Sequence, residues 1–136
     1  QPFQLADYKG KTVVLMFFPL AFSGVCTKEM CAIADDFGAW DTLGAEVLGI
    51  SVDSPYVNQK FAESVNAKFP IVSDFNKEAT VKFGVYREDL GGLRGVSERA
   101  AFVINAKGIV TYAWVGEHPG VFPPLDDIKD AVAAAG

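Results

Sequence analysis

The sequence contains few of the side chains that metal centres and disulfide scaffolds require. Its 136 residues include two cysteines and one histidine, His118. These three side chains cannot supply the four protein ligands of a structural zinc site, so we expect neither a metal ion nor another cofactor. Two cysteines are also too few for a disulfide-rich secreted domain, which favours a reducing compartment and therefore the cytoplasm.

The sequence also lacks long apolar runs and runs of like charge. The longest apolar stretch, Val13–Phe22, contains Pro19 and is far shorter than the ~18 residues that a membrane span needs. The net charge is −5 and the Lys and Arg residues are scattered, which argues against nucleic acid as a partner. The chain begins at Gln1 without an initiator methionine or a secretory pattern. The short apolar runs predict a soluble protein. The missing initiator methionine suggests that the chain has been processed or trimmed.

The remaining pattern predicts one domain over residues 1–136, because 50% hydrophobic residues are enough for a single core. Hydrophobic periodicity and turn residues predict alternating strands and helices, and no internal repeat is visible. The strands are expected at 12–18, 46–52, 70–73, 100–104 and 109–115, and the helices at 26–43, 55–65, 76–83 and 125–135, with a surface loop at 87–98. Helix-linked parallel strands followed by a hairpin predict an α/β protein with a thioredoxin-like fold, a mixed central sheet flanked by helices.

Cys26 is the main candidate for chemistry. The apolar run 12–18 breaks at Pro19, and a stripe of apolar residues at helical spacing then begins at Cys26 and continues through Met30, Ile33, Phe37 and Trp40. This places the thiol at the C-terminal end of a strand and in the first turn of a helix, where α/β folds place their active sites. The partial positive charge of a helix N-terminus favours the thiolate, which is the nucleophilic form.

The second cysteine, Cys31, follows five residues after Cys26. In a regular helix the two α-carbons would be ~8.6 Å apart, which exceeds the ~7 Å limit for a disulfide. Either Cys31 fills a partly buried helical position and is unrelated to Cys26, or the first turn of the helix unwinds during the working cycle.

Several side chains could support a reactive thiol at position 26. The hydroxyl of Ser23 could donate to the thiolate or to a substrate, although it could also be a local cap. Pro19 would form a dry wall of the site. Arg99 is the best placed cation, ahead of Arg87 and Arg94 in the loop; its alternative would be a surface pair with Glu98 or Asp53.

The segment Pro19–Cys26 resembles the active-site signature of the peroxiredoxins, which is Pro, three residues, Thr or Ser, two residues and Cys. The likeness covers nearly the whole chain, through segments 3–5, 51–53, 69–74, 83–85 and 99–104. The resemblance implies that Cys26 is the peroxidatic cysteine and becomes a sulfenic acid when it attacks a peroxide.

The same resemblance implies roles for the neighbouring residues. Ser23 would replace the commoner threonine and keep its hydroxyl, Arg99 would stabilise the thiolate and the peroxide oxygen, and Pro19 would shield the site. Glu29 matches an acidic position that helps to orient the arginine in some subfamilies. The alternative for Glu29 is a first-turn acid that favours the helix dipole.

The spacing of the cysteines is similar to that of the Q-type peroxiredoxins, also called bacterioferritin comigratory proteins. In that subfamily the second cysteine forms an intramolecular disulfide with the first. The resemblance therefore implies a Cys26–Cys31 disulfide, which thioredoxin or a similar dithiol protein would reduce. Segment 17–22 equally resembles the one-cysteine AhpE-type branch. The expected substrates are hydrogen peroxide and organic hydroperoxides, and the expected assembly is a monomer or a homodimer. A thioredoxin-like dithiol oxidoreductase is the other function class, but its two cysteines are normally separated by two residues.

Overall fold

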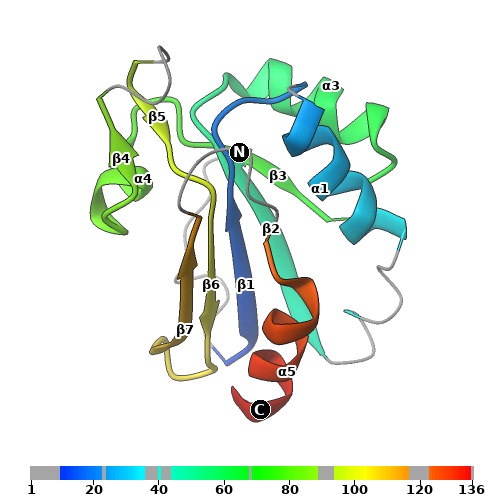
Figure 1. The fold of residues 1–136 in the computed structure, drawn as a ribbon, viewed down its shortest axis with the longest axis vertical. Coiled ribbons are helices and arrows are strands. Elements are labelled where there is room, and N and C mark those ends of the chain that lie inside the picture. The colour runs from blue at the N-terminus through cyan, green and yellow to red at the C-terminus, as the bar shows by residue number, and fades with distance from the viewer. Residues whose placement is uncertain are drawn as a thin grey trace.

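A computed structural model of the chain describes residues 10–22, 24–35, 40, 44–67, 69–88, 94–116 and 123–135, without the side chains of residues 24–26 and 35. Its central sheet has the strand order β3-β2-β1-β6-β7 (Figure 1). These strands are β1 (Thr12–Phe17), β2 (Ala45–Ser51), β3 (Ile71–Ser73), β6 (Ala100–Ile104) and β7 (Val110–Val115). β1, β2 and β3 are parallel, while β6 and β7 are antiparallel to their neighbours, so the predicted mixed sheet is confirmed.

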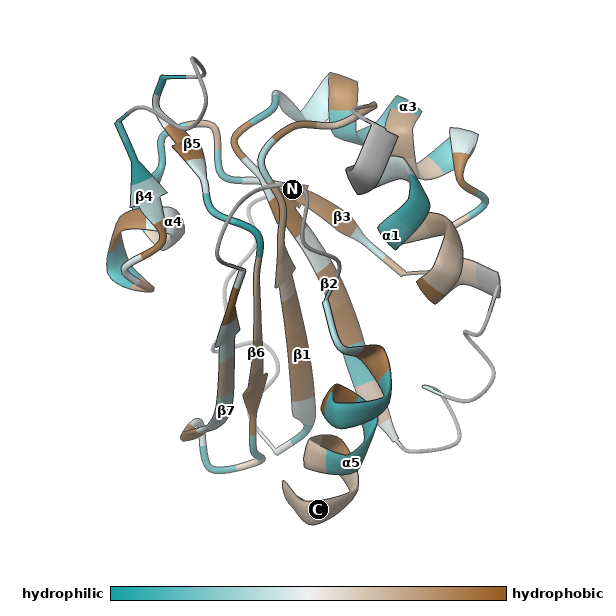
Figure 2. Cartoon of the chain, viewed as in Figure 1, coloured by the Kyte–Doolittle hydropathy of each residue, from teal (hydrophilic) through white to brown (hydrophobic). Residues whose placement is uncertain are grey.

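Helices cover both faces of the sheet. The helices are α1 (Gly24–Asp35), α3 (Pro55–Ser64), α4 (Glu78–Lys82) and α5 (Leu125–Ala135). Successive residues of β1 point to opposite faces, so Val14 and Met16 join one core cluster and Val13 and Leu15 join another. The first cluster includes buried residues of α1, α3 and α5, and the second contacts α4. This two-sided burial explains the nearly continuous hydrophobic colour of β1 in Figure 2.

Local sequence signals account for the starts and ends of several elements. Ser54 caps α3, because its hydroxyl accepts a hydrogen bond from the Val57 amide at 3.2 Å, and Pro55 occupies the first helical position. Gly84 follows α4 with φ +74°, the left-handed conformation expected of a residue that stops a helix. β6 and β7 form the predicted hairpin, with a register shift between Val103 and Ile104.

The structure corrects three of the predicted boundaries and faces. Val57 is 38% exposed instead of lying on the buried face of α3, and Asn58 is buried in its place because its amide finds polar partners inside. The helix predicted at 76–83 is shorter, since Lys77 adopts φ 65° and α4 begins after it. The predicted loop 87–98 is bounded by a two-stranded ladder of β4 (Tyr86–Arg87) and β5 (Val96–Ser97), strands too short to show a periodic pattern.

The helical stripe that begins at Cys26 is confirmed where it is described. Met30, Ile33 and Trp40 are each 0% exposed and belong to the first core cluster. Phe37 and the expected course of the helix between Asp35 and Gly44, apart from Trp40, lie outside the described residues. None of the helices in the described ranges has the length and apolar character needed to cross a membrane.

Candidate functional site

The candidate site begins where β1 ends. Phe18 continues the ladder by donating its amide to the Ile50 carbonyl at 3.0 Å, and Pro19, which has no N–H, ends it. Pro19 is buried. The chain then turns through Ala21 and Phe22, whose φ is +66°, before α1 starts at Gly24. The break predicted at Pro19 therefore occurs at the carboxyl edge of the parallel strands.

Cys26 is the third residue of α1, so its backbone lies in the first helical turn, as predicted. The first turn of a helix has amides without intrahelical acceptors, and these favour a negative charge. α1 has no acidic residue in that turn to oppose a thiolate. The Cys26 side chain and Ser23 lie outside the described residues, as does His118.

Arg99 and Glu29 form a buried ion pair beside this turn. Arg99 Nη1 donates to Glu29 Oε1 at 2.6 Å, and the two residues are 2% and 0% exposed. Arg99 immediately precedes Ala100, which pairs with Phe17 at the end of β1. Glu29 follows Cys26 by three residues, so the two positions are neighbours on one side of α1. The pair therefore joins the start of β6 to the side of the helix on which position 26 lies.

This geometry excludes two of the alternatives drawn from the sequence. Glu29 is the sixth residue of α1 and not a first-turn acid, and it is fully buried rather than exposed near the helix end. Arg99 does not form a surface pair: Glu98 instead accepts from Arg87 at 2.9 Å, and Asp53 accepts from a backbone amide. Arg94 is exposed.

Burial dominates the electrostatics of the pair. It raises the pKa of Glu29 from 4.5 to about 7, although the charge of Arg99 and the hydrogen bond from it act in the opposite direction. The second oxygen, Oε2, has no hydrogen-bond partner in the described part of the chain. Near neutral pH the carboxyl group of Glu29 can therefore change its charge.

Cys31 lies on the same helix, half-buried, with a free thiol. It packs against the first core cluster, as a small apolar residue would. Because positions 26 and 31 both lie within α1, the helical distance of ~8.6 Å applies to their α-carbons. A disulfide between them therefore requires α1 to open.

A polar network, missed from the sequence, surrounds the end of β2. Asp53 accepts from the Ala21 amide, and Ser51, Asn58 and Ser73 complete the network. Two features of the sequence could have indicated this network. One is Ser51-Val52-Asp53 at the end of an apolar strand, and the other is Asn58, which follows the apolar Val57 in the predicted helix. The network lies against the same loop that leads from Pro19 to α1.

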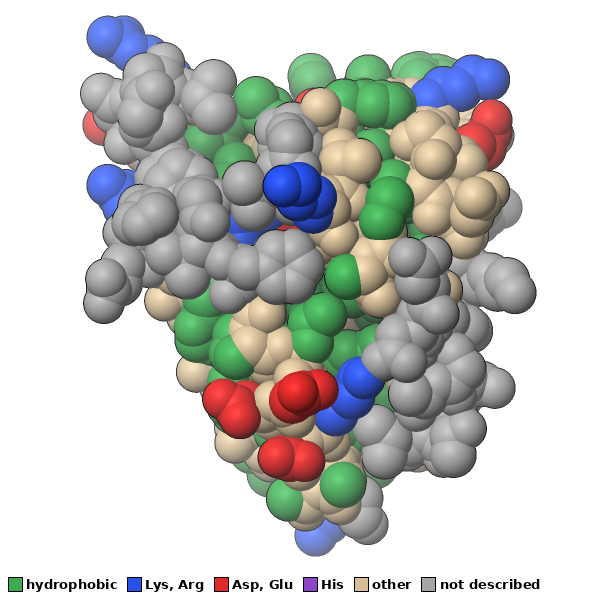
Figure 3. All heavy atoms as spheres, turned by 45° about the vertical axis from the view of Figure 1, so that its right-hand side comes forward, with side chains coloured by type: hydrophobic (Ala, Val, Ile, Leu, Met, Phe, Trp, Pro, Cys, Tyr) green, Lys and Arg blue, Asp and Glu red, His purple; other side chains and the backbone are tan. Residues whose placement is uncertain are grey.

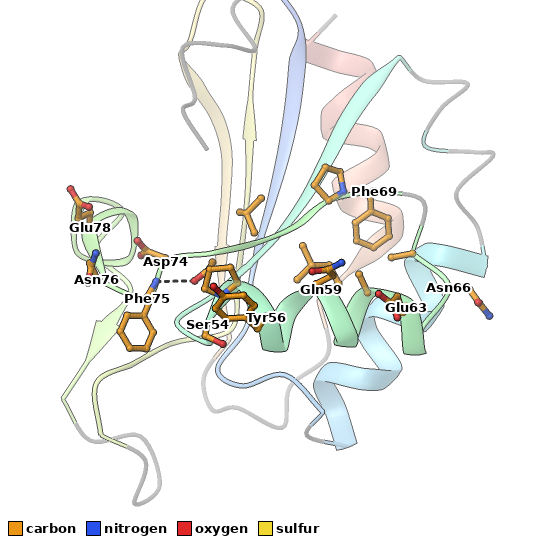
Figure 4. Close-up of a pocket in the computed structure, with 17 residues that line it drawn as sticks. Ser54, Tyr56, Gln59, Glu63, Asn66, Phe69, Asp74, Phe75, Asn76 and Glu78 are labelled. Atoms are coloured by element: carbon orange, nitrogen blue, oxygen red, sulfur yellow. Dashed lines mark hydrogen bonds between the residues drawn. The ribbon is translucent and has the colours of Figure 1, made fainter. Parts of the chain in front are cut away.

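A groove of about 1330 Å³ lies elsewhere, between α3 and the edge strand β3 (Figure 4). Tyr56, Gln59 and Glu63 line it from α3, and Phe69 and Phe75 line it near β3. Neither Glu29 nor Arg99 borders this groove, so we do not place thiol chemistry there.

The described residues hold no group of three His, Cys, Asp or Glu side chains able to bind a metal ion.

Acidic side chains gather over α5 on the face drawn in Figure 3, where Asp126, Asp127 and Asp130 are exposed. Basic side chains of the described residues form no comparable group on that face.

The sequence model of the AhpC/TSA family matches residues 1–113. The chloroplastic 2-cysteine peroxiredoxin of Chattonella marina var. antiqua is 38% identical over 120 residues, which cover 82% of this chain and 59% of that protein. Peroxiredoxin-2 of Rattus norvegicus is 34% identical over 123 residues, covering 85% and 60%. The chain thus spans less than two thirds of the length of these curated relatives.

Solved structures have the same fold. The peroxidoxin BcpB of Mycobacterium tuberculosis superposes with a TM-score of 0.86 and 30% identity, over 100% of this chain and 88% of that one. The reduced 2-Cys peroxiredoxin of Plasmodium vivax gives a TM-score of 0.82 and 29% identity, over 96% and 68%. These similarities confirm the predicted thioredoxin-like fold.

Proposed function

Because this chain belongs to the AhpC/TSA family, the peroxiredoxins, we propose that it is a thiol-dependent peroxidase with Cys26 as its nucleophile. The observation that supports this most is the buried Arg99–Glu29 pair beside the helical turn that contains position 26. A buried guanidinium is a fixed positive charge, and such a charge lowers the pKa of a nearby thiol and stabilises negative charge on a reacting oxygen.

In the proposed reaction the Cys26 thiolate attacks one oxygen of a hydroperoxide. An S–O bond forms, the O–O bond breaks, and the leaving oxygen takes a proton to become water or an alcohol. The sulfur supplies the two electrons and becomes a sulfenic acid. Arg99 would stabilise the thiolate and the departing oxygen, and Glu29 would orient Arg99. Ser23 would donate its hydroxyl to the reacting atoms, and Pro19 would keep water from one side of the site.

We propose Cys31 as the resolving thiol. Its attack on the sulfenic acid would form a Cys26–Cys31 disulfide and release water, and thioredoxin or a similar dithiol protein would then reduce the disulfide. If the opening of α1 extends beyond the first turn, it would break the Glu29–Arg99 hydrogen bond and would move Met30, which is 0% exposed, out of the core. Exposing a methionine costs about 1.5–3 kcal/mol, which the new covalent bond must offset.

This energetic cost is the specific observation in favour of the second candidate, a one-cysteine AhpE-type peroxidase. In that mechanism an external thiol reduces the sulfenic acid while α1 stays intact. A dithiol oxidoreductase is supported less, because α1 separates its two cysteines by four residues instead of two. We further propose a cytoplasmic location and a monomeric or homodimeric state; light scattering would measure the latter.

One thiol-counting experiment tests the peroxidase and separates the two candidates. Reduced wild-type protein is mixed with one equivalent of hydrogen peroxide, beside the matched variants Cys26→Ser and Cys31→Ser, and free thiols and intact mass are measured. We expect wild type to lose both thiols, Cys31→Ser to stop at a sulfenic acid on Cys26, and Cys26→Ser to remain reduced. A wild-type protein that keeps Cys31 reduced while Cys26 is oxidised would support the one-cysteine mechanism. No loss of the Cys26 thiol would overturn the peroxidase.

A further inference from the structure

Asp53 lies just beyond the end of β2, and its carboxylate reaches the loop that precedes α1. Oδ2 of Asp53 accepts hydrogen bonds from the Ala21 amide at 2.7 Å and from the Ser51 hydroxyl at 2.7 Å. Ala21 is separated from Asp53 by 32 positions in the sequence, so only the fold brings these groups together. A carboxylate that accepts a backbone N–H forms one of the stronger types of hydrogen bond in proteins.

Asp53 is itself held in place by side chains of β2 and β3, and a side chain of α3 holds its partner Ser51. The Asp53 amide donates to Ser51 Oγ at 3.2 Å, and the Ser73 hydroxyl donates to the Asp53 carbonyl. Asn58 Nδ2 donates to Ser51 Oγ at 3.0 Å and to the Val72 carbonyl at 3.1 Å. Ser51 and Asn58 are both 0% exposed. Asp53 is thus bonded directly to β2 and β3 and, through Ser51, to α3, so it has little freedom to follow the loop if the loop moves.

The loop that Asp53 holds contains a conformation that needs support. Phe22 has φ +66°, which costs a non-glycine residue about 1 kcal/mol or more. Among the contacts of the described residues, the Ala21–Asp53 hydrogen bond holds the chain there, and so does the ring of Phe22, whose centroid is 5.1 Å from that of Phe61. Ala21 also packs against the first core cluster. The Phe22 side chain is 54% exposed, so its packing alone is a weak constraint. The hydrogen bond is therefore a stronger constraint on the loop than this ring contact.

We propose that Asp53 is a positioning residue for the peroxidase site: its bond to the Ala21 amide fixes the loop from Pro19 to Phe22, and thereby the first turn of α1 relative to Arg99. This role rests on the function proposed above. Ala21 lies between buried Pro19 and the helix that carries Cys26, while Arg99 is held from the other side of β1 by the start of β6. Loosening the loop would change the distance between the thiol and the guanidinium without removing either group.

The test compares Asp53→Ala with two matched variants, all in a Cys31→Ser background that leaves one thiol. Asp53→Asn keeps an oxygen that can accept from Ala21. Asp74→Ala removes a carboxylate of similar burial that accepts the Ala79 and Thr80 amides at 3.2 and 2.6 Å, far from the loop in sequence and without a side-chain bond to it. Asp74→Ala therefore reports what the loss of such hydrogen bonds does to stability alone.

Two quantities are measured for each variant. The first is the rate at which Cys26 reacts with hydrogen peroxide, and the second is the pH dependence of the rate at which iodoacetamide alkylates Cys26. For Asp53→Ala we expect the peroxide reaction to slow about tenfold to a hundredfold, as small misplacements do, and the midpoint of alkylation to move to higher pH. Asp53→Asn should recover most of the rate, and Asp74→Ala should match the parent in both. An Asp53→Ala protein that matches the parent in both would overturn the proposal.

If Asp53→Ala does not fold, amide hydrogen exchange of the wild-type protein still decides the question. The Ala21 amide should exchange at least tenfold more slowly than an unprotected amide, and exchange at the unprotected rate would refute the role of Asp53. A failure of the proposed peroxidase function can be distinguished from a failure of the proposed role of Asp53. A parent protein whose Cys26 does not react with peroxide would refute the peroxidase, whereas the alkylation profiles would still show whether Asp53 controls that thiol.

Discussion

The buried Glu29–Arg99 pair predicts an unusual pH dependence of stability. Folding raises the pKa of Glu29 from 4.5 to about 7 because burial disfavours its charge. The folded state therefore holds the proton more tightly than the unfolded state. The resulting stabilisation is fully present below pH 4.5 and is lost as the pH rises to about 7. At 1.36 kcal/mol per pH unit, the loss amounts to about 3 kcal/mol.

The substitution Glu29→Gln should remove this dependence. Glutamine has nearly the same shape as a protonated glutamate, and its carbonyl oxygen can still accept from Arg99 Nη1, but it does not titrate. We expect the free energy of unfolding of wild type to fall by about 3 kcal/mol more than that of Glu29→Gln between pH 4.5 and pH 8. The comparison cancels the contributions of the other titrating groups, which both proteins share.

Urea unfolding of the reduced proteins at pH 4.5, 6, 7 and 8 measures this difference. The matched control is Glu63→Gln, because Glu63 is exposed and forms only a surface ion pair with Lys60 at 3.5 Å. Its pH dependence should follow that of wild type. If wild type instead gained stability over Glu29→Gln as the pH rose, the attraction of Arg99 would exceed the effect of burial, and a raised pKa of Glu29 would be refuted.

Two further predictions concern the site and the packing beneath it. Arg99→Lys keeps the charge but loses the planar guanidinium, and it should slow the peroxide reaction about a hundredfold in stopped-flow measurements, whereas Arg87→Lys on the exposed Glu98 pair should leave the rate unchanged. An equal rate for both variants would remove Arg99 from the mechanism. Phe61→Ala should lower the free energy of unfolding by about 3–5 kcal/mol, because this ring is 0% exposed and contacts Phe18 and Phe22. Val57→Ala, at a residue 38% exposed on the same helix, should change it by less than about 0.5 kcal/mol in chemical denaturation, and equal losses would contradict the assignment of the buried face.

The Glu29–Arg99 pair also relates the proposed catalytic cycle to the integrity of α1. Glu29 lies between the two cysteines, so an opening of α1 that extends beyond the first turn to Glu29 would separate it from Arg99. Breaking a buried pair leaves a charge without its partner, which is strongly destabilising unless the carboxyl is protonated or becomes solvated. The resolving step that we propose would thus depend on the same ionisation that governs stability.

Much of the fold could be predicted because it depends on local signals. Several elements carry their own pattern of polarity or backbone preference. They are the apolar strands β1 and β2, the start of α3 at Ser54–Pro55, Gly84 after α4, and the turn at 105–108. Such signals do not require knowledge of distant residues. The same holds for the placement of Cys26, which follows from a strand that ends and a helix that begins.

The sequence by itself determined the order of strands and helices, the position of the candidate thiol in a first helical turn, and the family signature at Pro19–Cys26. Only the tertiary structure decided what Glu29, Asn58 and Asp53 do. Each is a polar residue whose local pattern fits a solvent-exposed position, and each is buried or anchored by partners from distant segments: Arg99 for Glu29, Ser51 and Val72 for Asn58, and Ala21 for Asp53. The physical reason is that periodicity records the average polarity of a face, whereas the burial of a polar group depends on one specific partner being present.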